Sequence, residues 1–209
     1  MLTVYAIPPS LYCAKLRITL RAKGVAWREV LPPGGYGSAD YKALVPSGNL
    51  PAVQVDGLLL ADSEAIAEYL NEVYPSPAML PDTAAGRARM RERGRFHDTR
   101  LEPALRALFG SIKAPDAALS AAQSGAISER LAQLGRMLGA DDLAFGLGDC
   151  GYPITFAWID ALTPVLGLQI DWPQAVRAYR ARVEAVGPVA AELQSYVPVL
   201  QAWLAEARG

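Results

Sequence analysis

The sequence predicts an α/β domain followed by an all-helical domain, because the pattern of its apolar residues changes near residue 80. Short β-prone segments alternate with helical periodicity before that point, whereas only helical runs separated by Gly, Pro and Asp follow it. The 209 residues and the 52% hydrophobic content are sufficient for buried cores. We predict one domain over residues 1–78, a linker near residues 76–82 and a helical domain over residues 84–209.

Charge and cysteine content narrow the class of protein. The chain has 20 basic and 21 acidic residues without a long block of one sign, which disfavours nucleic acid and anionic membranes as partners. Cys13 and Cys150 are too few for a disulfide framework. The N-terminus lacks the pattern of a signal peptide, and no apolar run approaches the roughly 18 residues of a membrane span. We therefore expect a cytoplasmic protein.

The first part of the chain is predicted to fold as β-α-β, then a short helix, then β-β-α. Apolar residues at helical spacing that end at Gly24 predict the first helix. Asp56-Gly57 between two apolar runs predicts a hairpin, and a capped helix follows Asp62 and ends before Pro75. The other predicted segments are strands at residues 2–7 and 25–30 and a short helix at residues 39–44.

The second part is predicted to contain helices only. The first run carries arginines at alternate positions from Arg87 to Arg95, with Glu92 among them, which we interpret as a mostly solvated face. No repeat of fixed period is visible. The predicted helical runs lie within residues 84–109, 117–138, 154–166, 173–186 and 189–207.

The segment from Pro8 to Cys13 is predicted to form the start of the first helix. Two prolines precede Ser10, which is a favoured N-cap residue. Unpaired N–H groups and the macrodipole at a helix N-terminus favour a bound carboxylate, phosphate or thiolate. Cys13 lies one turn further on, and Lys15 recurs at helical spacing with the apolar residues of the same helix. The segment therefore predicts an anion site.

Several motifs resemble those of the cytosolic glutathione transferases, in particular a serine-type, zeta- or tau-like and bacterial-looking N-terminal motif. They are Ser-x-x-x-x-Lys-x-Arg-Ile from Ser10, Gly-Asn-Leu-Pro from Gly48, and Asp-Ser-x-x-Ile-x-x-Tyr-Leu from Asp62. The resemblance implies a thioredoxin-like first domain that binds glutathione and a helical domain that lines the electrophile pocket. It also implies a homodimer, with glutathione as co-substrate and no metal.

The resemblance places Ser10 at the position of the catalytic serine. A free thiol has a pKa of about 8.5 and only its thiolate is nucleophilic, so a helix N-terminus and one hydroxyl donor would raise the reactive fraction. We predict that Ser10 stabilises the glutathione thiolate. The simpler alternative is that Ser10 only caps its helix.

The other predicted contacts with glutathione lie in two turns. Leu50, before a cis Pro51, is expected to bind the cysteinyl part through its main chain; the alternative is a trans proline at a strand edge. Ser63 and Asp62 are expected to hold the γ-glutamyl carboxylate and ammonium, or otherwise only to cap a helix. Asn49 stands beside the glycine end, although its side chain is short.

Cys13 is a candidate for a competing redox chemistry. It could form or resolve a mixed disulfide with glutathione. The alternative is that Cys13 is a small buried hydrophobe, because Ser10 occupies the position of the first thiol of a dithiol pair. Cys150 is predicted to be structural.

The electrophile pocket is predicted from the resemblance, with wall residues in both domains. His97, the single histidine, lacks neighbouring ligands at metal spacing, and a packing or interface role is favoured for it. Thr155 matches the first residue of the family's capping box, but Trp158 replaces the acidic partner. The candidate wall residues are Tyr12, Phe96, His97, Arg100 and Phe109.

The predicted function is that of a glutathione transferase-like enzyme, which transfers alkyl or aryl groups. It would stabilise the glutathione thiolate for attack on a small apolar electrophile. Two alternatives stay open: a non-catalytic binding or scaffold protein of the same fold, and a glutathione-dependent isomerase or reductase.

Overall fold

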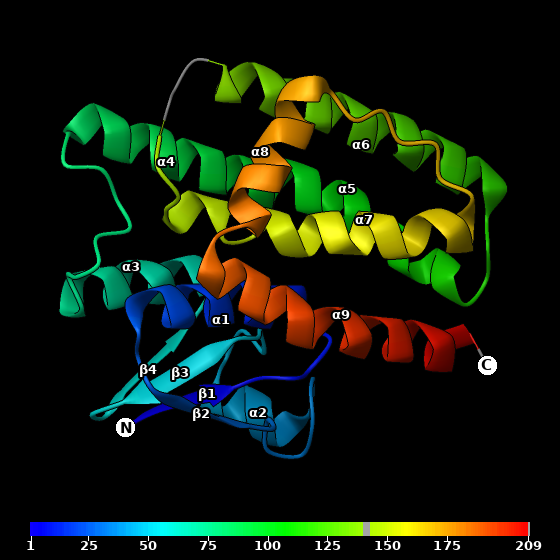
Figure 1. Ribbon diagram of the computed structural model, residues 1–209. Coiled ribbons are helices and arrows are strands. Elements are labelled where there is room, and N and C mark those ends of the chain that lie inside the picture. Colours follow the sequence, from blue (N-terminus) through cyan, green and yellow to red (C-terminus); the bar gives the residue numbers. More distant parts are fainter. Residues whose placement is uncertain (140–142, 209) are drawn as a thin grey trace. The chain divides into compact units, whose positions relative to one another are not determined.

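The computed structural model describes residues 1–139 and 143–208, which form two compact units (Figure 1). The first unit spans Met1–Met79 and the second spans Leu80–Gly209. The first contains a four-stranded sheet with helices, and the described residues of the second contain helices only. The predicted fold class, an α/β part followed by an all-helical part, is confirmed.

The first unit has the predicted order of elements. Its strands lie in the order β2-β1-β3-β4, in which β1 is parallel to β2 and antiparallel to β3, and β3 is antiparallel to β4. In chain order the elements are β1 (Leu2–Tyr5), α1 (Leu11–Lys23), β2 (Trp27–Val30), α2 (Ala39–Leu44), β3 (Ala52–Val55), β4 (Leu58–Ala61) and α3 (Ser63–Val73).

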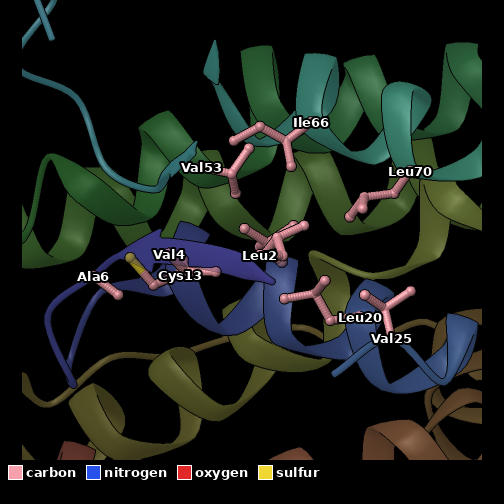
Figure 2. Packing of buried hydrophobic residues seen from close by; sticks show 10 residues of the cluster. Leu2, Val4, Ala6, Cys13, Leu20, Val25, Val53, Ile66 and Leu70 are labelled. Atoms are coloured by element: carbon pink, nitrogen blue, oxygen red, sulfur yellow. The ribbon is translucent and has the colours of Figure 1, made fainter. Parts of the chain in front are cut away.

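Successive side chains of a strand point to opposite faces of the sheet, and side chains are buried on both faces. Leu2 and Val4 of β1 and Val53 of β3 pack with side chains of α1 and α3 in one core cluster, shown in Figure 2. On the opposite face, Tyr41 of α2 packs with Ala52 of β3. Helices α1 and α3 therefore cover one face of the sheet and α2 covers the other.

Two turns confirm local signals in the sequence. Asp56 and Gly57 have φ angles of 47° and 84°, positive at both central positions as a tight hairpin of this kind requires. Gly24 has a φ of 63° and ends α1. The hairpin sets the register between β3 and β4, in which Ala52 lies opposite Ala61.

The second unit is built around α7. This helix contacts α5, α8 and α9, and α6 contacts α5 and α8. The buried side chains of α7 include Phe156, Ile159 and Leu162. The helices are α4 (Ala84–Phe96), α5 (Glu102–Arg106), α6 (Ala117–Leu138), α7 (Tyr152–Leu166), α8 (Gln174–Glu184) and α9 (Gly187–Arg208).

The helical run predicted within residues 84–109 is helical from Ala84 to Arg106, but it is not one regular α-helix. Helix α4 ends at Phe96, and a π-helical turn over His97–Leu101 separates it from α5. In that turn the Glu102 N–H donates to the carbonyl of His97, five residues earlier. Pro103 lacks an N–H and would clash inside a regular helix, and it lies instead in the first turn of α5.

Arg93 is buried and is the exception to the mostly solvated face predicted for these arginines, of which Arg89, Arg91 and Arg95 are exposed. Its Nε lies 2.9 Å from Oδ1 of Asp149, and its Nη2 donates to Oδ2 at 3.1 Å. The Tyr179 hydroxyl donates to Oδ1 at 2.5 Å, and the Gly146 N–H donates to Oδ2 at 2.9 Å. Burial raises the pKa of Asp149, while Arg93 and these hydrogen bonds oppose that rise. The partners of this carboxylate join α4, α8 and the segment before α7.

We expect Leu70→Ala to lower the free energy of unfolding by about 2–5 kcal/mol, because Leu70 is fully buried in the core cluster of the first unit. Urea unfolding followed by circular dichroism measures this change. Val73→Ala is the matched control on the same helix, because Val73 is 48% exposed and its truncation should cost at most about 0.5 kcal/mol. Equal losses in the two variants would contradict the packing of α3.

Candidate functional site

Three segments of the first unit meet at one edge of its sheet. Tyr5 at the end of β1 pairs with Ala52 at the start of β3, and Ala52 pairs with Ala61 at the end of β4. The segment after β1, the segment before β3 and the segment after β4 therefore meet at this edge. They contain six of the residues predicted from the sequence, namely Ser10, Asn49, Leu50, Pro51, Asp62 and Ser63.

Ser10 is the N-cap of α1. Its backbone is extended, with φ of −68° and ψ of 121°, and its Oγ accepts a hydrogen bond from the Cys13 N–H at 3.3 Å. The side chain is half-buried. Capping uses the hydroxyl oxygen as an acceptor, so its proton can still be donated to an anion bound at the helix N-terminus.

Cys13 lies in the core. The residue is 1% exposed and belongs to the cluster that contains Val4 (Figure 2). Burial raises the pKa of the Cys13 thiol, and hydrogen bonds with Ser10 and Ile7 lower it by less. A buried, protonated thiol disfavours the redox alternative. Cys150 is also buried and forms no disulfide.

The Leu50-Pro51 peptide bond is cis, as the resemblance implied. Within the part of the chain that the structure describes, the N–H and C=O of Leu50 take part in no hydrogen bond. The buried Tyr41 donates its hydroxyl to the Asn49 carbonyl at 2.7 Å. Burial raises the pKa of Tyr41 to about 12, so the hydroxyl stays a donor at neutral pH. Helix α2 thus supports the backbone before Leu50.

The side chain of Asn49 is exposed at this turn. The preceding Gly48 has a φ of 66°, and a Cβ on Gly48 would lie 3.3 Å from side-chain carbons of Lys42. The aliphatic stem of Lys42 therefore lies against the turn, and Lys42 is a second exposed polar residue near Asn49.

Asp62 and Ser63 form the start of α3. Asp62 has a φ of 86°, a conformation that non-glycine residues adopt mainly at strained or functional positions. Its Oδ1 accepts hydrogen bonds from the N–H groups of Glu64 at 2.9 Å and Ala65 at 3.2 Å. Ser63 is 6% exposed, yet its hydroxyl has no hydrogen-bond partner among the described residues. The Ser63 hydroxyl is therefore available to a ligand.

His97 is enclosed within the second unit. It is 1% exposed, its Nδ1 lies 2.7 Å from Oδ1 of Asp98, and its Nε2 lies 2.7 Å from Oγ1 of Thr155. Thr155 lies inside α7, which begins at Tyr152, and is therefore not at the N-cap position that it would have in the family's capping box. These contacts give His97 a packing and hydrogen-bonding role.

The other predicted pocket residues are more accessible. Phe96 and Phe109 are half-buried and Arg100 is exposed. The Phe109 ring stacks on Trp158 with the ring centroids 4.6 Å apart. Tyr12, in the first turn of α1, is half-buried. Their contact with an electrophile stays a prediction.

Two absences apply to residues 1–139 and 143–208. No group of three or more His, Cys, Asp or Glu side chains in these residues could hold a metal ion. No helix in the same residues is long and apolar enough to cross a membrane.

Three residues that support the site, Lys15, Glu64 and Tyr41, were not predicted from the sequence. Lys15 is 2% exposed, and its Nζ lies 2.7 Å from Oε2 of Glu64. The helical spacing of Lys15 with apolar residues indicated that its side chain would be buried, but nothing in the sequence identified Glu64 as its partner. The sequence did not indicate a role for Tyr41. Its hydroxyl donates to the carbonyl of Asn49, which is eight residues further along the chain and is brought close to Tyr41 by the turn.

Residues 4–78 match the family model of the glutathione S-transferase N-terminal domain. This stretch contains the whole edge of the sheet described above. The resemblance predicted from the motifs is therefore confirmed for the first unit.

Solved structures of low sequence identity show the same fold over nearly the whole chain. A delta-class glutathione transferase from Nilaparvata lugens has a TM-score of 0.82 and 18% identity, covering 99% of this chain and 100% of that one. A theta-class glutathione S-transferase from Xanthomonas axonopodis pv. citri, with glutathione bound, has a TM-score of 0.78 and 23% identity, with coverages of 95% and 98%. The chain has the glutathione transferase fold.

Curated relatives match over shorter stretches. Maleylacetoacetate isomerase of Pseudomonas aeruginosa is 42% identical over 83 residues, which cover 37% of this chain and 39% of the relative. A stringent starvation protein A homolog of Pasteurella multocida is 37% identical over 93 residues, which cover 43% of each chain. The chain thus spans about two fifths of the length of these relatives.

We expect Cys13 to react slowly with thiol reagents in the native protein, because its thiol is buried and its pKa is raised. A Cys150→Ala variant isolates the labelling of Cys13, and its rate in native buffer is compared with its rate in urea. Labelling of Cys13 should be slow in native buffer and complete in urea. Rapid native labelling at neutral pH would support the redox alternative.

Proposed function

We propose that this protein is a glutathione-dependent enzyme whose first unit binds glutathione and activates its thiol. The sulfur would bind at the N-terminus of α1 beside Ser10. The cysteinyl main chain would pair with Leu50, and Ser63 and Asp62 would hold the γ-glutamyl end. Asn49 would lie beside the glycine end.

The observation that supports this proposal most is the set of unpaired polar groups at one edge of the sheet. Leu50 offers a main-chain donor and acceptor, and Ser63 offers a nearly buried hydroxyl, none of them paired within the described residues. The N-termini of α1 and α3 begin at the same edge, and each favours negative charge. Two separated anionic groups, a thiolate and a carboxylate, fit these two helix ends.

Ser10 would act by stabilising the thiolate and not as a nucleophile. A hydrogen bond to a charged group contributes about 1.5–3 kcal/mol, which increases the ionised fraction of a thiol that is mostly protonated at neutral pH. No general base is needed for this role. The proposed reaction is nucleophilic addition to, or substitution on, a small apolar electrophile, with transfer of an alkyl or aryl group to sulfur.

Isomerisation is the second candidate, and it is supported by the isomerases among the relatives. The Pseudomonas aeruginosa relative is named for an isomerisation, and a bacterial zeta-class maleyl pyruvate isomerase shares the fold with a TM-score of 0.71, 22% identity and coverages of 91% and 95%. A thiolate that adds reversibly to a conjugated double bond permits rotation about that bond. Product analysis separates the candidates, because transfer gives a thioether and isomerisation returns free glutathione.

A binding protein of the same fold is the non-catalytic alternative. The stringent starvation protein A homolog is not named for a reaction. Calorimetric titration tests this alternative, because failure to bind millimolar glutathione would overturn the enzymatic proposal. We also propose a homodimer from the resemblance, and light scattering that gives the mass of one chain would contradict it.

We expect Ser10→Ala to lower the rate of the glutathione-dependent reaction roughly 10- to 100-fold, because the hydrogen bond to the thiolate is lost. The variant's activity should also rise at higher pH than that of the parent, because the bound thiol would have a higher pKa. Initial rates with a broad electrophile, measured across pH, test both effects.

Thr83→Ala is the control for loss of a helix cap. Thr83 caps α4, which has 13 residues like α1, and its hydroxyl oxygen accepts from the Gly86 N–H at 3.0 Å. Both variants should lose about 1 kcal/mol of stability, but only Ser10→Ala should lose activity. An unchanged rate in Ser10→Ala would remove Ser10 from its proposed role.

We expect Ser63→Ala to weaken glutathione binding roughly 10- to 100-fold, because the γ-glutamyl carboxylate loses a charge-assisted hydrogen bond. Asp62 caps α3, so the helix start should remain intact. Calorimetry with glutathione and with S-methylglutathione separates the roles of the two serines. Ser63→Ala should lower the affinity for both ligands, whereas Ser10→Ala should lower mainly the affinity for glutathione, which has the free thiol. Unchanged affinity in Ser63→Ala would refute this contact.

A further inference from the structure

A partly buried ion pair links the two helices whose N-termini form the proposed site. Lys15 of α1 is 2% exposed, and its Nζ lies 2.7 Å from Oε2 of Glu64, whose side chain is 16% exposed. The two residues are 49 positions apart in the sequence. Glu64 is the second residue of α3, and Lys15 lies five residues after Ser10. The pair is therefore a direct connection between the first turn of α3 and the first half of α1.

Stability alone does not explain this pair. Removing two charges from water carries a desolvation cost that their attraction often fails to exceed, and apolar residues of similar volume can replace such pairs without loss of stability. The neighbours of Lys15 on α1 are buried apolar residues, including Leu11 and Ile18. A charged residue at this position therefore suggests a role in orientation, because an ion pair with hydrogen-bond geometry fixes one arrangement.

The backbone around Glu64 connects the pair to Ser63. The Glu64 N–H donates to Oδ1 of Asp62 at 2.9 Å, so the residue on each side of Ser63 is held. On the other helix, Nζ of Lys15 lies 5.9 Å from the centre of the Tyr12 ring, in the same turn that Ser10 caps. The ion pair thus acts between two rigid helix starts.

We propose that Lys15 and Glu64 are positioning residues that set the distance between the hydroxyls of Ser10 and Ser63. This inference rests on the proposed function. Glutathione is one molecule, so the separation between its sulfur and its γ-glutamyl carboxylate must match the separation between the two hydroxyls. A small displacement of α3 along α1 then weakens both hydrogen bonds, because their strength falls steeply with distance and angle.

A second ion pair on α1 provides a matched control. Arg17 Nε donates to Oε1 of Glu29 at 2.6 Å, and Arg17 Nη2 donates to Oε2 at 3.0 Å. Glu29 lies on β2, at the opposite side of the sheet from β3 and β4. Arg17→Met therefore removes an ion pair from the same helix without changing the contact between α1 and α3.

The test compares Lys15→Met, Glu64→Gln and Arg17→Met with the parent. Calorimetry gives the affinity for glutathione, and the ultraviolet absorbance of the bound thiolate across pH gives the pKa of the bound thiol. Lys15→Met and Glu64→Gln should weaken binding roughly 10- to 100-fold and raise the pKa of the bound thiol. Arg17→Met should change the affinity by no more than about twofold.

A double variant, Lys15→Met with Glu64→Leu, separates positioning from stability. Two apolar side chains should restore the thermal midpoint toward that of the parent, because no unpaired charge is left buried. The affinity for glutathione should nevertheless stay low, because the directional contact is absent. This variant also keeps the test decisive if either single variant fails to fold.

Three outcomes specific to the ion pair would overturn the inference. The first is that Lys15→Met binds glutathione with the affinity and the thiol pKa of the parent. The second is that Lys15→Met and Arg17→Met lose affinity for glutathione to the same extent. Recovery of affinity together with stability in the double variant would show that the ion pair has only a structural role. If the parent itself fails to bind glutathione, the proposed function is overturned, and the inference with it.

Discussion

The pairing of β1 with β3, and of β3 with β4, brings together the three segments that carry the proposed glutathione site. Because β3 is antiparallel to β1 and β4 is antiparallel to β3, the segments that carry Ser10, Leu50 and Ser63 meet at one edge of the sheet. A register slip by one residue would turn Val4 and Val53 out of the core. The burial of these side chains therefore also specifies the geometry of the site.

The groups at this edge serve both folding and the proposed chemistry. The Ser10 oxygen caps α1 while its proton remains available. Asp62 caps α3 from an unusual backbone conformation, and the hydroxyl of the adjacent Ser63 has no hydrogen-bond partner among the described residues. Tyr41 supports the turn before Leu50 from the opposite face of the sheet. A ligand would thus meet groups that packing already holds in place, which lowers the entropy lost on binding.

Two buried polar side chains of the second unit, Asp149 and His97, have hydrogen-bonding partners within that unit. Asp149 accepts hydrogen bonds from Arg93, Tyr179 and a backbone N–H, and His97 lies between Asp98 and Thr155. Such networks specify one arrangement of helices, because a partner left unpaired in the core would be costly. Residues that sequence patterns had suggested as solvated or pocket-facing are used here for packing.

Local signals in the sequence determined most elements of the fold and the residues at the helix starts. Gly24 ends α1 and Asp62 begins α3 because their preferences act over one turn of chain. The tertiary structure alone decided that Lys15 pairs with Glu64 and that Arg93 is buried. The burial and partner of a charged side chain depend on residues tens of positions away, which no periodicity within a helix can identify.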